Sequence, residues 1–129
     1  MQDMLKEAIS DANSYLSALQ NASLDIAELF RRQNLNEANS KLSDLFQGIK
    51  MFIGLIKGLE LQYSPQTANS ATQVDKIIEE MGPSLESLID SQNQQDWILT
   101  ADILEFELLT TLSSFQDSLN QIRQKAGIL

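Results

Sequence analysis

The sequence predicts an all-α protein folded as an up-down-up-down four-helix bundle, and three observations support this prediction. Apolar residues recur every three or four positions over four long stretches, which is typical of helices with one buried face. The strict alternation of polar and apolar residues that marks a strand is absent. Only two prolines and five glycines occur in 129 residues, which argues against a loop-rich chain.

The four expected helices cover about residues 2–32, 35–61, 71–92 and 94–125. The third is expected to begin anywhere from Pro65 to Ala71, because this segment is small and polar. Its apolar spacing continues across Pro83, so we expect one helix with a kink near Pro83 and not two helices. In the second helix, Gly48 lies at the edge of the apolar arc, where it would allow close approach of a neighbouring helix.

Two asparagines mark the expected starts of the second and fourth helices. Asn34 and Asn93 are good N-cap residues, and each is followed three positions later by an acidic residue, as in a capping box. The apolar stripes of the expected helices predict the core. The stripe of the third helix includes Leu85, Leu88 and Ile89. The seam of the fourth helix is Trp97, Ala101, Leu104, Leu108, Leu112, Phe115, Leu119 and Ile122.

The chain is expected to be a single helical domain, residues 1–129, made of two similar hairpins. Hairpin one covers residues 1–62, a loop covers residues 63–70, and hairpin two covers residues 71–129. A shift of 59 residues places Gln33-Asn34 on Gln92-Asn93 and matches many apolar positions, either by duplication or by convergence on one turn. The alternative architecture is an elongated helical pair completed by a second copy.

The composition disfavours several classes of function. The net charge is −9, and such an acidic chain repels nucleic-acid phosphates and anionic membranes, so neither is an expected partner. No apolar run approaches the ~20 residues of a membrane span, and no signal-peptide core is visible. The sequence has no cysteine and no histidine, which suits a cytoplasmic location and removes the usual catalytic bases and metal ligands.

The chain is therefore expected to be no enzyme and to need no cofactor. No nucleophile has a visible base, and no glycine-rich phosphate loop is present. Asp102 and Glu105 share one helical side, but two carboxylates alone make a poor cation site. A metal-binding or enzymatic bundle is the least favoured alternative.

The last helix carries more apolar residues than one buried face requires. Leu99, Ile103 and Phe106 form a second stripe, roughly opposite Leu104 and Leu108 at 100° per residue. This stripe is the candidate site for a protein partner or for self-association as a homodimer, unless another part of the chain covers it.

The run Ala101–Glu107, following Asp96-Trp97, resembles a family of small acidic bacterial helical-bundle proteins of unknown function. That family has an Ala-Asp-Leu-Leu-Glu-Tyr-Glu-like run, in which Ile103 and Phe106 here replace leucine and tyrosine. The resemblance implies a helical bundle and no assigned activity. In size, charge and helicity alone, the chain also looks like acidic chaperones of flagellar or type III export.

These observations predict a non-enzymatic protein–protein interaction or scaffold module. The alternative within the same class is a chaperone-like binder of an amphipathic helix in a secretion or flagellar substrate.

Overall fold

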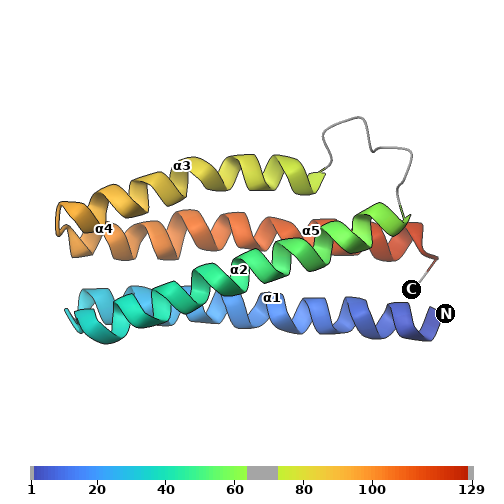
Figure 1. Cartoon of the computed structure of the whole chain (residues 1–129), viewed down its shortest axis with the longest axis horizontal. Helices are drawn as coiled ribbons and strands as arrows, with labels where there is room; N and C mark the ends of the chain where they lie inside the picture. The colour runs from blue at the N-terminus through green and yellow to red at the C-terminus, as the bar shows by residue number, and fades with distance from the viewer. Residues whose placement is uncertain (1, 64–72, 128–129) are drawn as a thin grey trace.

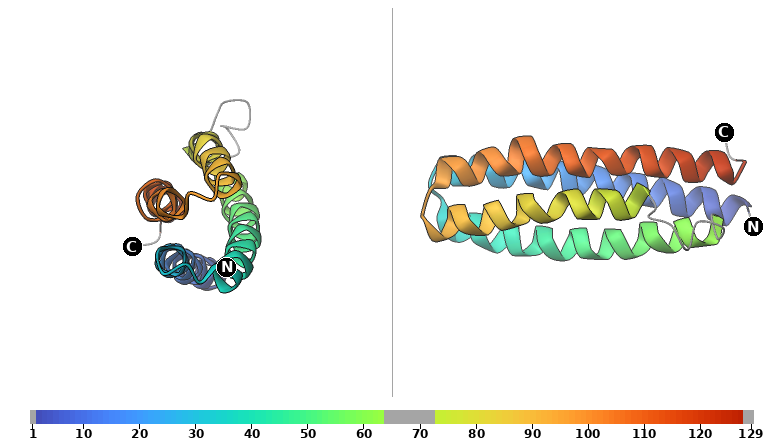
Figure 2. Two further views of the ribbon diagram at one scale, coloured as in Figure 1. Left: turned by 90° about the vertical axis from the view of Figure 1, so that its left-hand side faces the viewer. Right: turned by 90° about the horizontal axis from the view of Figure 1, so that it is seen from above.

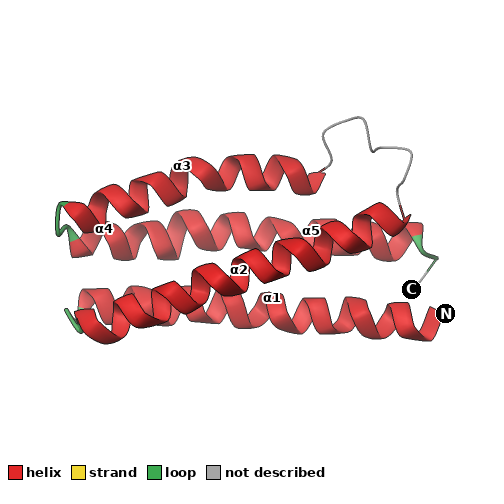
Figure 3. Ribbon diagram, in the orientation of Figure 1, coloured by secondary structure: helices red, strands yellow, loops and turns green. Residues whose placement is uncertain are grey.

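The computed structural model describes residues 2–63 and 73–127, which form four antiparallel helical rods (Figures 1 and 3). The first three rods are α1 (Gln2–Arg31), α2 (Leu35–Tyr63) and α3 (Gln73–Asn93). The last rod consists of α4 (Trp97–Asp102), a π-helical segment (Ile103–Leu108) and α5 (Leu109–Lys125). The predicted all-α four-helix bundle is confirmed, and one chain supplies all four rods.

The expected loop at residues 63–70 falls almost entirely outside the described residues. Tyr63 is the last residue of α2 and so belongs to a helix. The expected start of the third helix, between Pro65 and Ala71, also lies outside the described part.

The two halves of the bundle meet between α1 and the last rod. α1 packs against α2 and the last rod, and the last rod also packs against α3 (Figure 2). Apart from the half-buried Trp97, the predicted seam of the last rod is at most 3% exposed. Ring contacts join the elements, with centroids 5.3 Å apart for Phe52 and Phe115 and 5.8 Å apart for Phe30 and Trp97. Among the described helices, none has an apolar stretch long enough to cross a lipid bilayer.

The turns before α2 and before α4 have the same backbone geometry. Each contains a glutamine of positive φ, Gln33 at 58° and Gln95 at 57°, followed directly by the residue that precedes the next helix. That residue is Asn34 in the first turn and Asp96 in the second. The backbone hydrogen bonds around the two turns follow one pattern, with donor–acceptor distances between 2.9 and 3.0 Å.

The last rod therefore begins three residues later than predicted. The expected cap, Asn93, is the last residue of α3, and Asp96 is the N-cap instead, accepting a hydrogen bond from the Leu99 amide at 3.1 Å. The sequence pairs Asn34 with Asn93 because both follow a glutamine. The two turns correspond at their residues of positive φ, Gln33 and Gln95, so the offset between the turns is 62 residues and not 59.

The π-helical segment adds one residue to the second hairpin. Buried positions of α2 and of the last rod match at an offset of 62 up to Leu104 and of 63 from Leu108 onwards, so the offset changes inside this segment. The pairs are Ala38 with Thr100, Leu42 with Leu104, Leu45 with Leu108, Ile49 with Leu112, Phe52 with Phe115, Ile56 with Leu119, and Leu59 with Ile122. Because a π turn bonds i to i+5, it takes up the extra residue while the helix stays continuous.

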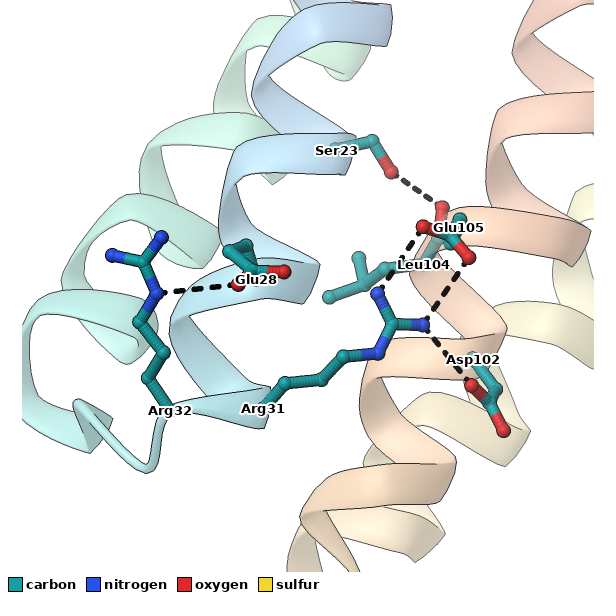
Figure 4. Close-up of polar contacts among 7 residues, drawn as sticks. All are labelled: Ser23, Glu28, Arg31, Arg32, Asp102, Leu104 and Glu105. Atoms are coloured by element: carbon teal, nitrogen blue, oxygen red, sulfur yellow. Dashed lines mark hydrogen bonds and ion pairs between the residues drawn. The ribbon is translucent and has the colours of Figure 1, made fainter.

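A buried serine of α1 contacts this segment. Ser23 Oγ donates a 2.7 Å hydrogen bond to the backbone carbonyl of Leu104, and Ser23 is fully buried (Figure 4). A π turn disturbs the regular ladder of backbone bonds, so an outside donor is valuable there. On the α3 side, the hydroxyl oxygens of Ser91 and Thr100 are 2.7 Å apart and hydrogen-bonded, which also fixes the start of the last rod.

α3 passes through Gly82 and Pro83 as one helix, as predicted, and its ribbon bends along its length (Figure 1). In a helix, the proline ring clashes with the Cβ of the preceding residue, and Gly82 has no Cβ. Pro83 is exposed, in agreement with its expected position on the solvent side.

Two glycines of α2 provide a test of the packing against α1. A Cβ built on Gly48 would lie 2.8 Å from Cδ2 of Leu19, whereas nothing lies within 4 Å of one built on Gly54. We predict that Gly54→Ala raises the free energy of unfolding by about 1 kcal/mol through helix propensity. Gly48→Ala should raise it less, because Leu19 must move. Urea denaturation measures both, and a larger gain for Gly48→Ala would contradict the close approach.

The Ser23 hydrogen bond provides a second test. Ser23→Ala leaves the buried carbonyl of Leu104 without this donor, and we predict a loss of about 1–3 kcal/mol in the free energy of unfolding. Ser17→Ala is the matched control, since Ser17 is an exposed serine of the same helix and its loss should cost under about 0.5 kcal/mol. Equal losses for the two variants would show that the Ser23 bond contributes nothing.

Candidate functional site

The predicted apolar stripe on the outside of the last rod is only partly exposed. Leu99 is 42% and Phe106 is 62% exposed, but Ile103 is 1% exposed and belongs to the core. The prediction of a three-residue outer stripe is therefore wrong at Ile103. The physical reason is that this rod lies between α1 and α3, so adjacent positions such as Ile103 and Leu104 are both buried. Ile98, 71% exposed, is a further outward apolar residue of this rod.

The acidic pair of the last rod binds an arginine. Arg31 Nη1 lies 3.1 Å from Oε1 of Glu105, and Arg31 Nη2 lies 3.1 Å from Oδ1 of Asp102 (Figure 4). Hydrogen bonds from its guanidinium to Glu105, and then to Asp102, raise the pKa of Arg31. The two carboxylates thus join α1 to the last rod, and a cation at this pair would have to displace the guanidinium.

A larger feature lies between α2 and α3. These helices pack against α1 and the last rod more closely than against each other, and an apolar groove of about 490 Å³ separates them. Its volume is within the ~300–1,000 Å³ of typical ligand sites. The α2 wall consists of Phe46, Ile49, Lys50 and Ile53. The α3 wall consists of Ile78, Met81, Gly82, Leu85 and Ile89.

Polar contacts between α2 and α3 lie beyond both ends of this groove. Towards the start of α2, Gln92 Nε2 donates a 2.8 Å hydrogen bond to Oδ1 of Asn39. Towards the end of α2, Nζ of Lys57 lies 3.5 Å from Oδ1 of Asp75. The two helices are therefore connected at either end, and the apolar walls between these contacts remain uncovered by the described residues.

The sequence did contain a signal for the groove. Both helices have apolar stripes two residues wide in the sequence: Phe46 and Ile53 directly follow Leu45 and Phe52 in α2, and Ile78 and Ile89 directly follow Ile77 and Leu88 in α3. Ile89 was expected in the core, but it is 53% exposed on the groove wall, and that prediction is wrong. A wide stripe predicts extra burial, and only the spacing of α2 and α3 shows that part of it stays open.

A second groove, of about 420 Å³, lies between α1 and α2 beside Gly48. Its apolar floor includes Leu19 and Leu45, and its rim carries Asp25, Lys41 and Asp44. Lys41 is paired with Glu37 at 3.3 Å, so the only cation of this rim already has a carboxylate partner.

Residues 7–118 match the model of a domain of unknown function (DUF8042), so the chain belongs to the DUF8042 family. The expected membership of a family without an assigned activity is thereby confirmed. No curated protein and no solved structure matches the chain.

The burial of Ile103 and the exposure of Phe106 predict opposite effects of truncation. Ile103→Ala should lower the free energy of unfolding by about 2–5 kcal/mol, because it empties a packed core position. Phe106→Ala should change it by under about 0.5 kcal/mol, because most of the ring is exposed. Thermal denaturation followed by circular dichroism measures both. A severe loss for Phe106→Ala would show that this ring, and not Ile103, belongs to the core.

Proposed function

We propose that this chain is a non-enzymatic protein–protein interaction module and that the α2–α3 groove is its binding surface. The observation that carries the proposal is the groove itself, which has a volume of about 490 Å³, two apolar walls, and polar contacts beyond both ends. Apolar surface rimmed by polar residues is a feature of protein interaction sites and of ligand-binding grooves.

The composition supports the same class of function. The part of the chain that the structure describes contains no cluster of three acidic, histidine or cysteine side chains placed to hold a metal ion. The carboxylates of Asp102 and Glu105 support the fold by binding Arg31. The charge of −9 still predicts that nucleic acids and anionic membranes are not the partners, and the cytoplasmic location stays a prediction.

Self-association through the last rod is the second candidate. Ile98, Leu99 and Phe106 are all exposed by 42% or more, which supports a contact with another chain. With Ile103 buried, however, this surface is smaller than the sequence predicts, and the groove between α2 and α3 offers two opposed apolar walls instead of one row of side chains.

A matched pair of isoleucines tests the proposal. Random 16-residue peptides are displayed and selected on the purified protein, and the selected peptides are then measured by fluorescence anisotropy. Ile89→Glu adds a charge to the groove wall, and Ile98→Glu adds the same charge to the outside of the last rod; both isoleucines are more than half exposed. We predict that Ile89→Glu weakens binding at least tenfold and that Ile98→Glu leaves it unchanged.

Circular dichroism provides the control that both variants keep their helices. Two results would contradict the groove as the binding surface. Either no peptide is selected, or the selected peptides bind more weakly to Ile98→Glu and equally well to Ile89→Glu. In the second case, the exposed surface of the last rod becomes the preferred site.

A further inference from the structure

We infer that the α2–α3 groove takes one amphipathic helix of a partner protein, with basic residues along one flank and acidic residues along the other, and that these charges set the direction in which the helix lies. The inference rests on the proposed function and deepens it. Three observations carry it: the charges along each wall, the lack of ion-pair partners for Lys50, Glu79 and Glu86 among the described residues, and the length and chemistry of the walls.

The α3 wall has an acidic edge. Along this helix, a groove residue is repeatedly followed by an exposed acidic residue. The reason is that each next position is rotated by 100° about the helix axis, here away from the core. Glu79 follows Ile78, and Glu86 follows Leu85; Asp90 follows Ile89 in the same way.

The α2 wall has the opposite character. From residue 45 to residue 59, the only charged side chains are Lys50 and Lys57. Lys50 lines the groove, and Lys57 lies further along the same helix, where it pairs with Asp75. The groove is therefore lined by one lysine on the α2 side and bordered by carboxylates on the α3 side, in a protein whose net charge is −9.

The charges nearest the middle of the groove are available to a partner. Among the described residues, ion pairs occupy Lys57 and Asp75, but Lys50, Glu79 and Glu86 take part in none. All three side chains belong to exposed residues. A partner that brings acidic groups to Lys50 and basic groups to the two glutamates would complete pairs that the chain itself leaves open.

The walls fit a helix better than an extended strand. Both walls are helices, whose backbone donors and acceptors are already paired, so neither offers an edge for strand addition. The α3 wall runs from residue 78 to residue 89, which is ~16 Å or three turns at 1.5 Å per residue. Such a groove accepts apolar residues spaced i, i+4 and i+7 on one face of a helix.

A second copy of the chain is a poorer occupant. Its exposed apolar residues on the last rod are Ile98, Leu99 and Phe106, and residues 94–122 contain no lysine or arginine. Docking residues 94–122 into the groove would supply no cation to pair with Glu79 and Glu86.

The charged walls have a geometric consequence. When a helix in the groove is turned end for end, its two flanks exchange walls. A helix with lysines on one flank and glutamates on the other therefore satisfies both walls in only one direction. A peptide with the flanks exchanged satisfies them in the opposite direction, so exchanging the flanks reverses the direction of the helix and leaves its affinity unchanged.

Three synthetic 18-residue peptides test the inference, each with the same leucine stripe. The first has lysines on one flank and glutamates on the other, the second has these flanks exchanged, and the third has glutamates on both. We predict that the first two bind with equal affinity and at least tenfold more tightly than the third, measured by isothermal titration calorimetry.

The direction of the bound peptide is measured by disulfide cross-linking. Only the introduced cysteine can react, because the chain has no cysteine of its own. Each peptide carries an N-terminal cysteine and is offered to Ser43→Cys and to Gly58→Cys, which are exposed positions towards opposite ends of α2. The first two peptides should prefer opposite positions, by at least fivefold in cross-linking rate. Lys50→Glu should reduce that preference, and Lys6→Glu, an exposed lysine of α1, should leave it unchanged.

Each result has one meaning. Opposite preferences for the exchanged peptides support the inference. Equal cross-linking at both positions, or tight binding of the all-glutamate peptide, overturns it. If displayed peptides bind the groove but none of the three helical peptides does, the helical occupant is wrong while the proposed interaction function stands. A homodimer in analytical ultracentrifugation that Ile89→Glu dissociates would also overturn it, because the second copy would then be the occupant.

Discussion

The fold depends on two constraints that act on the last rod. Its buried face must stay towards the bundle along its whole length, and its start is fixed by the geometry of the preceding turn. The turn at Gln95-Asp96 repeats the turn at Gln33-Asn34, and that sets the phase at which α4 begins. An uninterrupted α-helix with the extra residue would turn its later apolar positions away by about 100°. The π-helical segment Ile103–Leu108 takes up that residue, so that Leu108 to Ile122 return to the core.

Contacts from α1 converge on the same segment. Ser23 donates to the Leu104 carbonyl inside the bundle, and two turns later Arg31 binds Asp102 and Glu105 at its surface (Figure 4). The irregular part of the rod is thus held by one buried hydrogen bond and one surface ion-pair network. The buried bond is the stronger constraint, since exposed ion pairs contribute little to stability.

The groove follows from the same arrangement of neighbours. α1 and the last rod form the shared interior, and α2 and α3 each cover it from one side. α2 and α3 carry apolar stripes two residues wide. In each helix, the residues of the buried seam face the shared interior, and the apolar residues beside that seam face the other helix. Phe46 and Ile53 on α2 and Leu85 and Ile89 on α3 therefore line an open space bounded by Lys50 and an acidic edge. A bundle with narrower stripes would leave only polar residues there.

The sequence predicts the helices, most of the core and the all-α bundle because each depends on local periodicity, which Leu5 to Phe30 and Leu42 to Leu59 follow closely. It does not predict where the last rod begins, because Asn93 and Asp96 are both good caps and only the positive φ of Gln95 separates them. It misplaces Ile103 because exposure on a helix with two packed faces depends on its neighbours. The uninterrupted four-residue spacing of Leu104, Leu108 and Leu112 is the one local sign of the π segment. The exposure of Ile89 depends on the distance between α2 and α3, which no local pattern encodes.

α2 and α3 leave an open apolar groove beside Ile89, while the last rod, in its shifted phase, buries Ile103. Thiol accessibility tests both parts in one measurement, since the chain has no cysteine. Ile89→Cys and Ile103→Cys are each treated with a maleimide under native conditions and the rates are compared with those in urea. We predict that the thiol at position 89 reacts nearly as fast as in the unfolded chain and that the thiol at position 103 is protected by at least a hundredfold. Protection at position 89, or rapid labelling at position 103, would contradict it.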